Sequence, residues 1–396
     1  MKWTLLVPGA LLPAALAPEI ARALDAPRLA QRLREARPRF PHRAAERSRG
    51  AAHWSWLAQA FGLPADPPVT APYAWRALAE AGAQRAAPEG EAAEPGWIAH
   101  CDPVHVVVAR DHLLITELGE DALAPAETSA LLALANEAAD AARSPQASGE
   151  PLDLRFAVRA GHWFVRSAHP VALESFPVDA VLGRSVQPHL PEGAQARAWR
   201  ILSNEIQMLW HASDTNGARE QRGARAVNAL WIHGGGSWQA LPARDWDRLR
   251  VDAGSVDAAV LQGWLQAGAG QSRPGQGHRG GALAVYRELF SPYAHQAWDA
   301  WLARVPAWEE RLEQELAEAQ RQGATEFELV LCGAQEARSF AIPVRSPGSP
   351  LAALSSWAQR LSRGGAAALR PGSSPWQRLA EAADPADTGV PSGRAA

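Results

Sequence analysis

Residues 199–236 read WRILSNEIQMLWHASDTNGAREQRGARAVNALWIHGGG, and three structural signals follow one another there without a gap. The first part has apolar residues at helical spacing, which predicts an amphipathic helix with one buried face. This apolar arc consists of Trp199, Leu202, Ile206, Leu209 and Trp210. A second short helix is predicted to stop at Gly223, because glycine tolerates the left-handed conformation that ends helices. Val227 to Ile232 is then predicted to form a buried strand.

Polar residues of the same stretch predict a binding site. In an open α/β sheet, ligands bind at the carboxyl ends of strands, and backbone amides without side chains can approach an anion closely. An arginine would supply charge, and asparagine side chains would supply orientation. We therefore expect a ligand-binding set made of Asn204, Gln207, His211, Asn216, Arg219, Asn228, Gly234, Gly235 and Gly236.

Two plainer interpretations of these residues stay open. The polar arc of the helix is also typical of a solvated face, and three glycines are also typical of a tight turn. The glycine run is neither a nucleotide P-loop nor a dinucleotide fingerprint, since no Lys-Ser/Thr pair follows it and no helix with GxGxxG spacing opens there.

The composition limits the class of protein. The chain has 396 residues, of which 47% are hydrophobic and 20% charged, enough for a large core in one or two domains. A net charge of −3 without a basic block argues against nucleic-acid binding. With only Cys101 and Cys332, no disulfide framework or cysteine-based zinc site is expected, and a cytoplasmic location with reduced thiols is the default.

The first residues allow two interpretations. Lys2 and the apolar run from Trp3 to Ala17 resemble a secretory signal, but Pro8 and Pro13 interrupt that run. Leu5 to Val7, followed by Pro-Gly-Ala, instead predicts a first buried strand. Elsewhere no stretch approaches the ~18 apolar residues of a membrane span, so no membrane partner is expected.

A second dense region is WIAHCDPVHVVVARDHLLIT, residues 97–116. Val104–Val108 and Leu113–Thr116 are predicted to form a hairpin around Arg110-Asp111. Carboxylates and imidazoles suit zinc, manganese or iron, which makes Asp102, His105 and Asp111 candidate metal ligands. A hydrogen-bonded structural motif is the alternative and is favoured, because no third ligand stands at a diagnostic spacing.

The remaining segments predict an α/β fold with a mixed sheet flanked by helices and with β-hairpin additions. Further hairpins are expected at residues 152–167 and 327–344, and a helix over 293–322 that Pro306 divides. We expect a single domain over residues 1–361, with a glycine-rich loop at 268–281 and a disordered tail at 362–396.

Several sequence blocks resemble those of a known family, the bacterial RpfE-type regulatory proteins, which are described as phosphoglycerate-mutase-like. The matching blocks are Asp102–His105, Asn204–Leu209, Asn216–Arg219 and Val227–Trp231 with the glycine run, and their order agrees over roughly residues 1–345. More distantly, residues 227–236 look like a segment of archaeal-type cofactor-independent phosphoglycerate mutases of the alkaline-phosphatase superfamily. The resemblance implies a reduced form of that fold and, in the enzymes, two divalent metals for phosphoryl transfer.

The chain departs from the enzymes where the metals would bind. The resemblance places a metal-binding aspartate at the end of the first strand, and this chain has Pro8-Gly9-Ala10 there. We therefore expect a non-catalytic regulatory protein that binds a small phosphorylated ligand or a protein partner and has no cofactor. The alternative is an active mutase or phosphoesterase that holds manganese or zinc through Asp102, His105 and Asp111.

Overall fold

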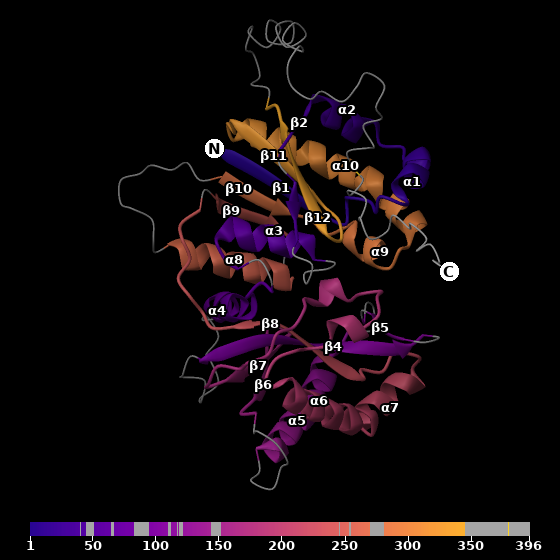
Figure 1. Cartoon of the computed structure of the whole chain (residues 1–396), viewed down its shortest axis with the longest axis vertical. Helices are drawn as coiled ribbons and strands as arrows, with labels where there is room; N and C mark the ends of the chain where they lie inside the picture. The colour runs from indigo at the N-terminus through magenta and orange to yellow at the C-terminus, as the bar shows by residue number, and fades with distance from the viewer. Residues whose placement is uncertain are drawn as a thin grey trace, which may run out of the picture. The chain divides into compact units, whose positions relative to one another are not determined.

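The computed structural model describes residues 1–39, 41–44, 51–64, 67–82, 95–109, 112–116, 118, 122–143, 152–244, 246–252, 255–269, 281–344 and 379. The chain forms two compact units (Figure 1), one of residues 1–44, 245–250 and 277–396 and one of residues 45–244 and 251–276. We expected a single domain, but the apolar residues are divided between two sheets that each have their own core. The predicted tail at 362–396 lies outside the described residues except for Leu379, and so does most of the predicted loop at 268–281.

The first unit is built on a mixed sheet. Its strands lie in the order β2 (Arg37–Pro38), β12 (Glu336–Ile342), β11 (Glu326–Cys332), β1 (Lys2–Pro8), β10 (Gly281–Val285) and β9 (Trp246–Val251), and β3 (His42–Arg43) also pairs with β12. The central strand β1 runs parallel to both neighbours, β10 and β11, while β11 and β12 are antiparallel. Residues 3–8 of β1 are all buried, as expected for a strand with parallel neighbours. The prediction of a first buried strand is confirmed.

Helices cover one face of this sheet. They are α1 (Ala17–Ala23), α2 (Pro27–Glu35), α9 (Phe290–Ala294) and α10 (Trp298–Arg321). Trp3, Leu33 and Trp308 belong to one buried cluster, which packs β1, α2 and α10 together. The predicted division at Pro306 is wrong, because α10 continues through this residue. Proline removes one helical hydrogen bond, and the buried apolar side chains on both sides of it hold the helix in place.

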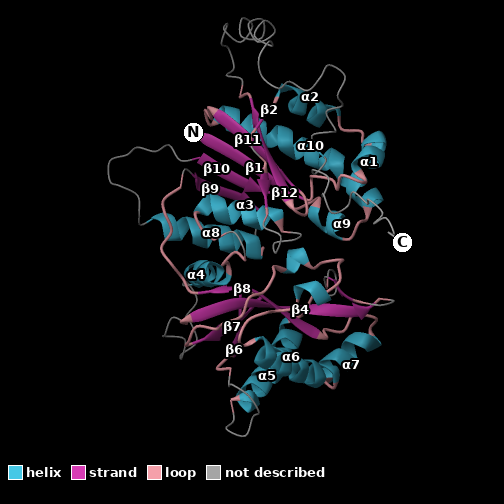
Figure 2. Ribbon diagram, in the orientation of Figure 1, coloured by secondary structure: helices cyan, strands magenta, loops and turns pink. Residues whose placement is uncertain are grey.

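The second unit is built on an antiparallel sheet. Its strands lie in the order β5 (Leu113–Thr116), β4 (Trp97–Val108), β7 (His162–Ser167) and β6 (Arg155–Arg159), and β8 (Ala229–Gly236) pairs with β4. The helices are α3 (Ala52–Phe61), α4 (Ala71–Gly82), α5 (Pro125–Ala142), α6 (Ala196–His211), α7 (Asp214–Gln221) and α8 (Val256–Ala269), with short 3-10 helices η3 (Val178–Ala180) and η4 (Gln187–His189). α5 and α6 pack on one face of the sheet through a cluster that includes Leu131, Ile206 and Ile232. α4 packs on the other face, against β4 and β8 (Figure 2). The predicted α/β class, with sheets flanked by helices, is confirmed.

The predicted hairpins are confirmed in both units. β4 pairs with β5, β6 with β7, and β11 with β12, all antiparallel. Ala160 and Gly161 turn between β6 and β7 with φ angles of 49° and 83°, where glycine is the favoured residue. Arg110 and Asp111, the expected turn between β4 and β5, lie outside the described residues.

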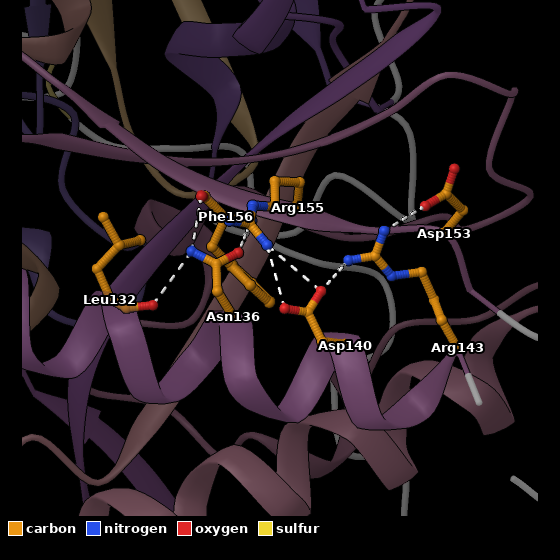
Figure 3. A network of polar contacts seen from close by, with 7 residues as sticks. All are labelled: Leu132, Asn136, Asp140, Arg143, Asp153, Arg155 and Phe156. Carbon is orange, nitrogen blue, oxygen red and sulfur yellow. Dashed lines mark hydrogen bonds and ion pairs between the residues drawn. The ribbon is translucent and has the colours of Figure 1, made fainter. Parts of the chain in front are cut away.

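Asparagine side chains tie helices and strands of the second unit together. Nδ2 of Asn136 in α5 donates to the carbonyl of Phe156 in β6 over 3.1 Å, and its Oδ1 accepts from the Phe156 amide over 2.9 Å (Figure 3). Near Asn136, the exposed side chain of Asp140 forms ion pairs with Arg143 and Arg155. Exposed ion pairs contribute little to stability. The two amide hydrogen bonds of Asn136 therefore fix the position of β6 on α5.

Candidate functional site

The predicted ligand-binding set is not assembled at one place. Asn204, Gln207 and His211 are exposed on α6, while the opposite, apolar arc of that helix is buried against the sheet. These residues therefore form a solvated polar face, which was the alternative interpretation of the helix.

Asn216 and Asn228 use their side chains on backbone groups. Nδ2 of Asn216 donates to the carbonyls of Trp210 and Val227, each over 2.8 Å, and its Oδ1 accepts from the Val227 amide over 2.9 Å. Asn228 accepts from the amide of Val106 over 2.7 Å and donates to its carbonyl over 2.9 Å. The amide oxygen and nitrogen of both side chains, which were expected to bind a ligand, therefore bind backbone groups of the protein instead.

Arg219 is fully buried and pairs with an acid of α5. Its Nη1 lies 2.9 Å from Oε2 of Glu127, and its Nε donates to the Arg225 carbonyl over 2.8 Å. Glu127 also accepts from the amide of Ala124 and from Arg222. Burial raises the pKa of Glu127, but these hydrogen bonds and the two arginine charges outweigh it and hold the pKa below its usual range. Arg219 thus joins α7 to α5.

The glycine run lies inside β8 and forms a β-bulge. His233 pairs with His100, but Gly236 pairs with Ile98, so β8 has one residue more than β4 over this interval. Gly234 has a φ angle of 62°, the left-handed conformation that glycine supplies in such bulges. A Cβ atom on Gly234 would lie 2.0 Å from Oγ1 of Thr70, and one on Gly235 would lie 2.5 Å from the Trp97 ring. Gly234 is required by packing and by its backbone conformation, and Gly235 is required by packing.

The three candidate metal ligands are not brought together either. Asp102 binds His233, whereas Nδ1 of His105 lies 2.7 Å from the carbonyl of Ala226. Three positions apart on one strand, Asp102 and His105 point to opposite faces of the sheet, and Asp111 lies outside the described residues. Among the described residues, no group of three or more His, Cys, Asp or Glu side chains could hold a metal ion.

The structure instead brings together Asp102, His233 and His100 on the face of the sheet that α4 covers. Nε2 of His233 lies 2.7 Å from Oδ2 of Asp102, and the carboxylate makes Nε2 the hydrogen-bond donor. The rings of His100 and His233 are stacked, with centroids 4.9 Å apart. The side chain of Asp102 is 34% exposed and that of His233 10%, so the pair lies where the protein meets solvent.

His100 is the buried member of this group. Its Nδ1 has no hydrogen-bond partner among the residues that the structure describes, and its ring packs on His233 and Phe164. Burial lowers the pKa of His100 well below its usual value, and the charges of His233 and His162 lower it further. His100 is therefore neutral at physiological pH.

With Nε2 donating to Asp102, Nδ1 of His233 is the ring nitrogen that can accept a hydrogen bond. The group fits the binding of a polar ligand.

Sequence reasoning overlooked His100 and His233. The available signal was the alternation that puts His100 and Asp102 on one face of a predicted strand, together with the His233 that precedes the glycine run. The pairing of β4 with β8 joins residues that are 131 positions apart, and no local pattern reveals it.

The carboxyl end of β1 is enclosed within the first unit. A Cβ atom on Gly9 would lie 2.9 Å from the carbonyl oxygen of Leu289 and 2.9 Å from Cβ of Tyr293. The carbonyl of Gly9 accepts a hydrogen bond from Nε1 of Trp301 over 2.8 Å. Backbone and aromatic side chains thus fill the place where the family resemblance puts a metal-binding aspartate.

Comparison with known proteins finds only structural likeness. No family model matches the chain, and no curated protein is similar to it at a significant level. The PH0037 protein from Pyrococcus horikoshii aligns with a TM-score of 0.44 and 10% identity, over 87% of this chain and 88% of that chain. A cofactor-independent phosphoglycerate mutase from Thermoplasma acidophilum DSM 1728 aligns with a TM-score of 0.32 and 13% identity, over 88% and 90%. Neither likeness assigns an activity or a ligand to this chain.

None of the described helices is both long enough and apolar enough to span a membrane.

Proposed function

We propose that this protein is a cytoplasmic ligand-binding or regulatory protein on a phosphoglycerate-mutase-like scaffold, and that it does not catalyse metal-dependent phosphoryl transfer. Its ligand is a small phosphorylated molecule, and a protein partner would receive the regulatory signal. Membership of the RpfE-type family is part of this proposal. It rests on the blocks Asp102–His105, Asn204–Leu209 and Val227–Gly236 in the sequence.

The observation that carries the proposal is the enclosed carboxyl end of β1. Two-metal phosphoryl transfer requires acidic and imidazole ligands that converge on two cations. At Gly9, any side chain would collide with backbone at 2.9 Å, so an aspartate could not be introduced there without moving α9. This supports a protein that has the phosphoglycerate-mutase-like scaffold but does not catalyse two-metal phosphoryl transfer.

The test is a metal and activity assay on the full-length protein. Purified protein should contain less than about one divalent ion per chain and should show no mutase or phosphatase activity when manganese or zinc is added. Calorimetry with inorganic phosphate and 3-phosphoglycerate should give heat of binding. Metal-dependent turnover would overturn the proposal in favour of an active enzyme that uses Asp102, His105 and Asp111.

A further inference from the structure

Helix α6 presents two large apolar side chains to solvent. Ile201 is 50% exposed and Met208 is 67% exposed, on a helix that lies on the opposite side of its sheet from α4 (Figure 2). They are seven residues apart, so they lie within about 20° of each other around the helix axis. Both stand in the middle of the polar face, away from the buried arc that contains Ile206. An apolar stripe of this kind is typical of a helix that packs against another helix.

The spacing of seven residues fits a heptad repeat, which places one charge on each side of the stripe. With Ile201 and Met208 at a positions, Arg200 is at a g position and Glu205 at an e position. In a parallel pair of identical helices, a residue at g lies beside the residue at the following e position of the other helix. Arg200 of one copy therefore lies beside Glu205 of the other, and two-fold symmetry forms this ion pair twice.

Arg200 and Glu205 have no partner within the single chain. Ion pairs along a helix form between residues three or four positions apart. No residue at these distances from Glu205 is basic, and none at these distances from Arg200 is acidic. Neither residue forms an ion pair elsewhere in the part of the chain that the structure describes. Both charges are therefore available to a second copy of the chain.

The charges favour a parallel pair over an antiparallel one. In an antiparallel pair with Ile201 against Met208, the same flank of both helices would meet, and Glu205 would lie beside Glu205 of the partner subunit. Like charges at such a contact repel each other. Polar residues at d positions specify the register at a cost in affinity, which makes the expected dimer reversible. The d positions hold Arg197, Asn204 and His211.

We propose that α6 is a self-association surface, through which two copies of this chain form a reversible dimer with their α6 helices parallel. Ile201 packs on Ile201 of the partner subunit, and Met208 packs on Met208 of the partner subunit. Two ion pairs between Arg200 and Glu205 flank this apolar contact. The dimer is independent of the proposed ligand and gives a role to the exposed residues of the block Asn204–Leu209.

The experiment is sedimentation velocity of the full-length protein from about 10 to 500 μM chain, the range in which weak dimers form. We expect the average mass to rise from one chain towards two. Met208→Lys places two like charges at the symmetry axis and should weaken association at least ~10-fold. Val108→Lys is the matched control, because Val108 is 84% exposed in β4, outside this surface, and should associate like the unmodified protein.

A charge exchange tests the pairing of the two flanks. Arg200→Glu alone and Glu205→Arg alone should each weaken association about 10-fold, because like charges then lie beside each other. The double variant should restore it, since the opposite charges meet again in the exchanged order. Circular dichroism spectra of all three variants should match that of the unmodified protein, because both side chains are exposed.

A Met208→Cys variant tests the direction of the helices, because the native Cys101 and Cys332 are buried. In a parallel dimer the two new thiols meet at the axis, and oxidation by diamide should link them as a disulfide. Three results would overturn the inference: a monomer at every concentration, a dimer that Met208→Lys leaves intact, or a double charge variant that does not associate. None of these results bears on whether the protein binds a phosphorylated ligand.

Discussion

The side-chain amide of Asn228 makes hydrogen bonds with both backbone groups of Val106, at 2.7 Å and 2.9 Å. An amide side chain has the same donor and acceptor as a peptide unit, so Asn228 extends the pairing of β8 along β4 beyond Val104, to Val106. Asn216 in α7 likewise binds both backbone groups of Val227, and Asn136 in α5 binds both backbone groups of Phe156 (Figure 3). In all three cases asparagine satisfies backbone groups that the sheet leaves without a partner.

We predict that Asn228→Ala destabilises the protein by about 2 kcal/mol, because it leaves the amide and the carbonyl of Val106 without their partner. Urea unfolding followed by tryptophan fluorescence measures the change. Asn204→Ala is the matched control, since Asn204 is exposed on α6 and should change stability by less than about 0.5 kcal/mol. Equal effects of the two substitutions would show that the hydrogen bonds to Val106 contribute nothing.

We predict a larger loss, about 3 kcal/mol, for Arg219→Ala, because a fully buried guanidinium is removed from Glu127 and from the Arg225 carbonyl. Arg222→Ala removes the other arginine that contacts Glu127, but Arg222 is half exposed, and the loss should stay below about 1 kcal/mol. Urea unfolding of both variants checks the difference. If Arg219 served a ligand rather than the fold, its removal would weaken phosphate binding and leave stability unchanged.

The sequence predicts the elements of this fold better than the roles of its polar residues. Hydrophobic periodicity reports burial directly, so α6 and the hairpin of β6 and β7 follow from the pattern of apolar residues. An asparagine amide, in contrast, binds a ligand or a peptide group equally well. Asn216 and Asn228 bind backbone groups of Val227 and Val106, and only the three-dimensional structure shows which partner each amide has.

The candidate site depends on contacts that are distant in sequence. His100 and His233 become neighbours only through the pairing of β4 with β8, in which they are the last pair in regular register before the bulge at Gly234. The run of three glycines was visible in the sequence, but its cause lies in Thr70 and Trp97, which occupy the space of the missing side chains. Packing between remote segments thus explains a motif that resembled a ligand loop.

We predict that Gly234→Ala destabilises the protein by about 2 kcal/mol or more, because the residue has positive φ and its Cβ would lie 2.0 Å from Oγ1 of Thr70. Gly217→Ala is the matched control in α7, where nothing lies within 4 Å of an added Cβ. That change should stabilise the protein by about 0.5–1 kcal/mol, since alanine favours the helix. Thermal unfolding of both variants measures the two changes in stability, which should have opposite signs. A Gly234→Ala protein as stable as the unmodified protein would contradict the bulge.

Finally, we predict that stability falls as the pH is lowered through the unfolded-state pKa of His100. The folded protein depresses the pKa of His100, so the unfolded chain binds a proton that the folded chain excludes. The contribution of His100 to stability is therefore fully present above the ordinary histidine pKa of about 6.5 and is lost as the pH falls, by up to ~1.4 kcal/mol per pH unit, until the depressed folded pKa is reached. Urea unfolding between about pH 8 and pH 5 should show this slope. In His100→Gln the slope should decrease while the fold is kept, because glutamine cannot take up the proton. An unchanged slope in that variant would mean that other groups cause the acid sensitivity.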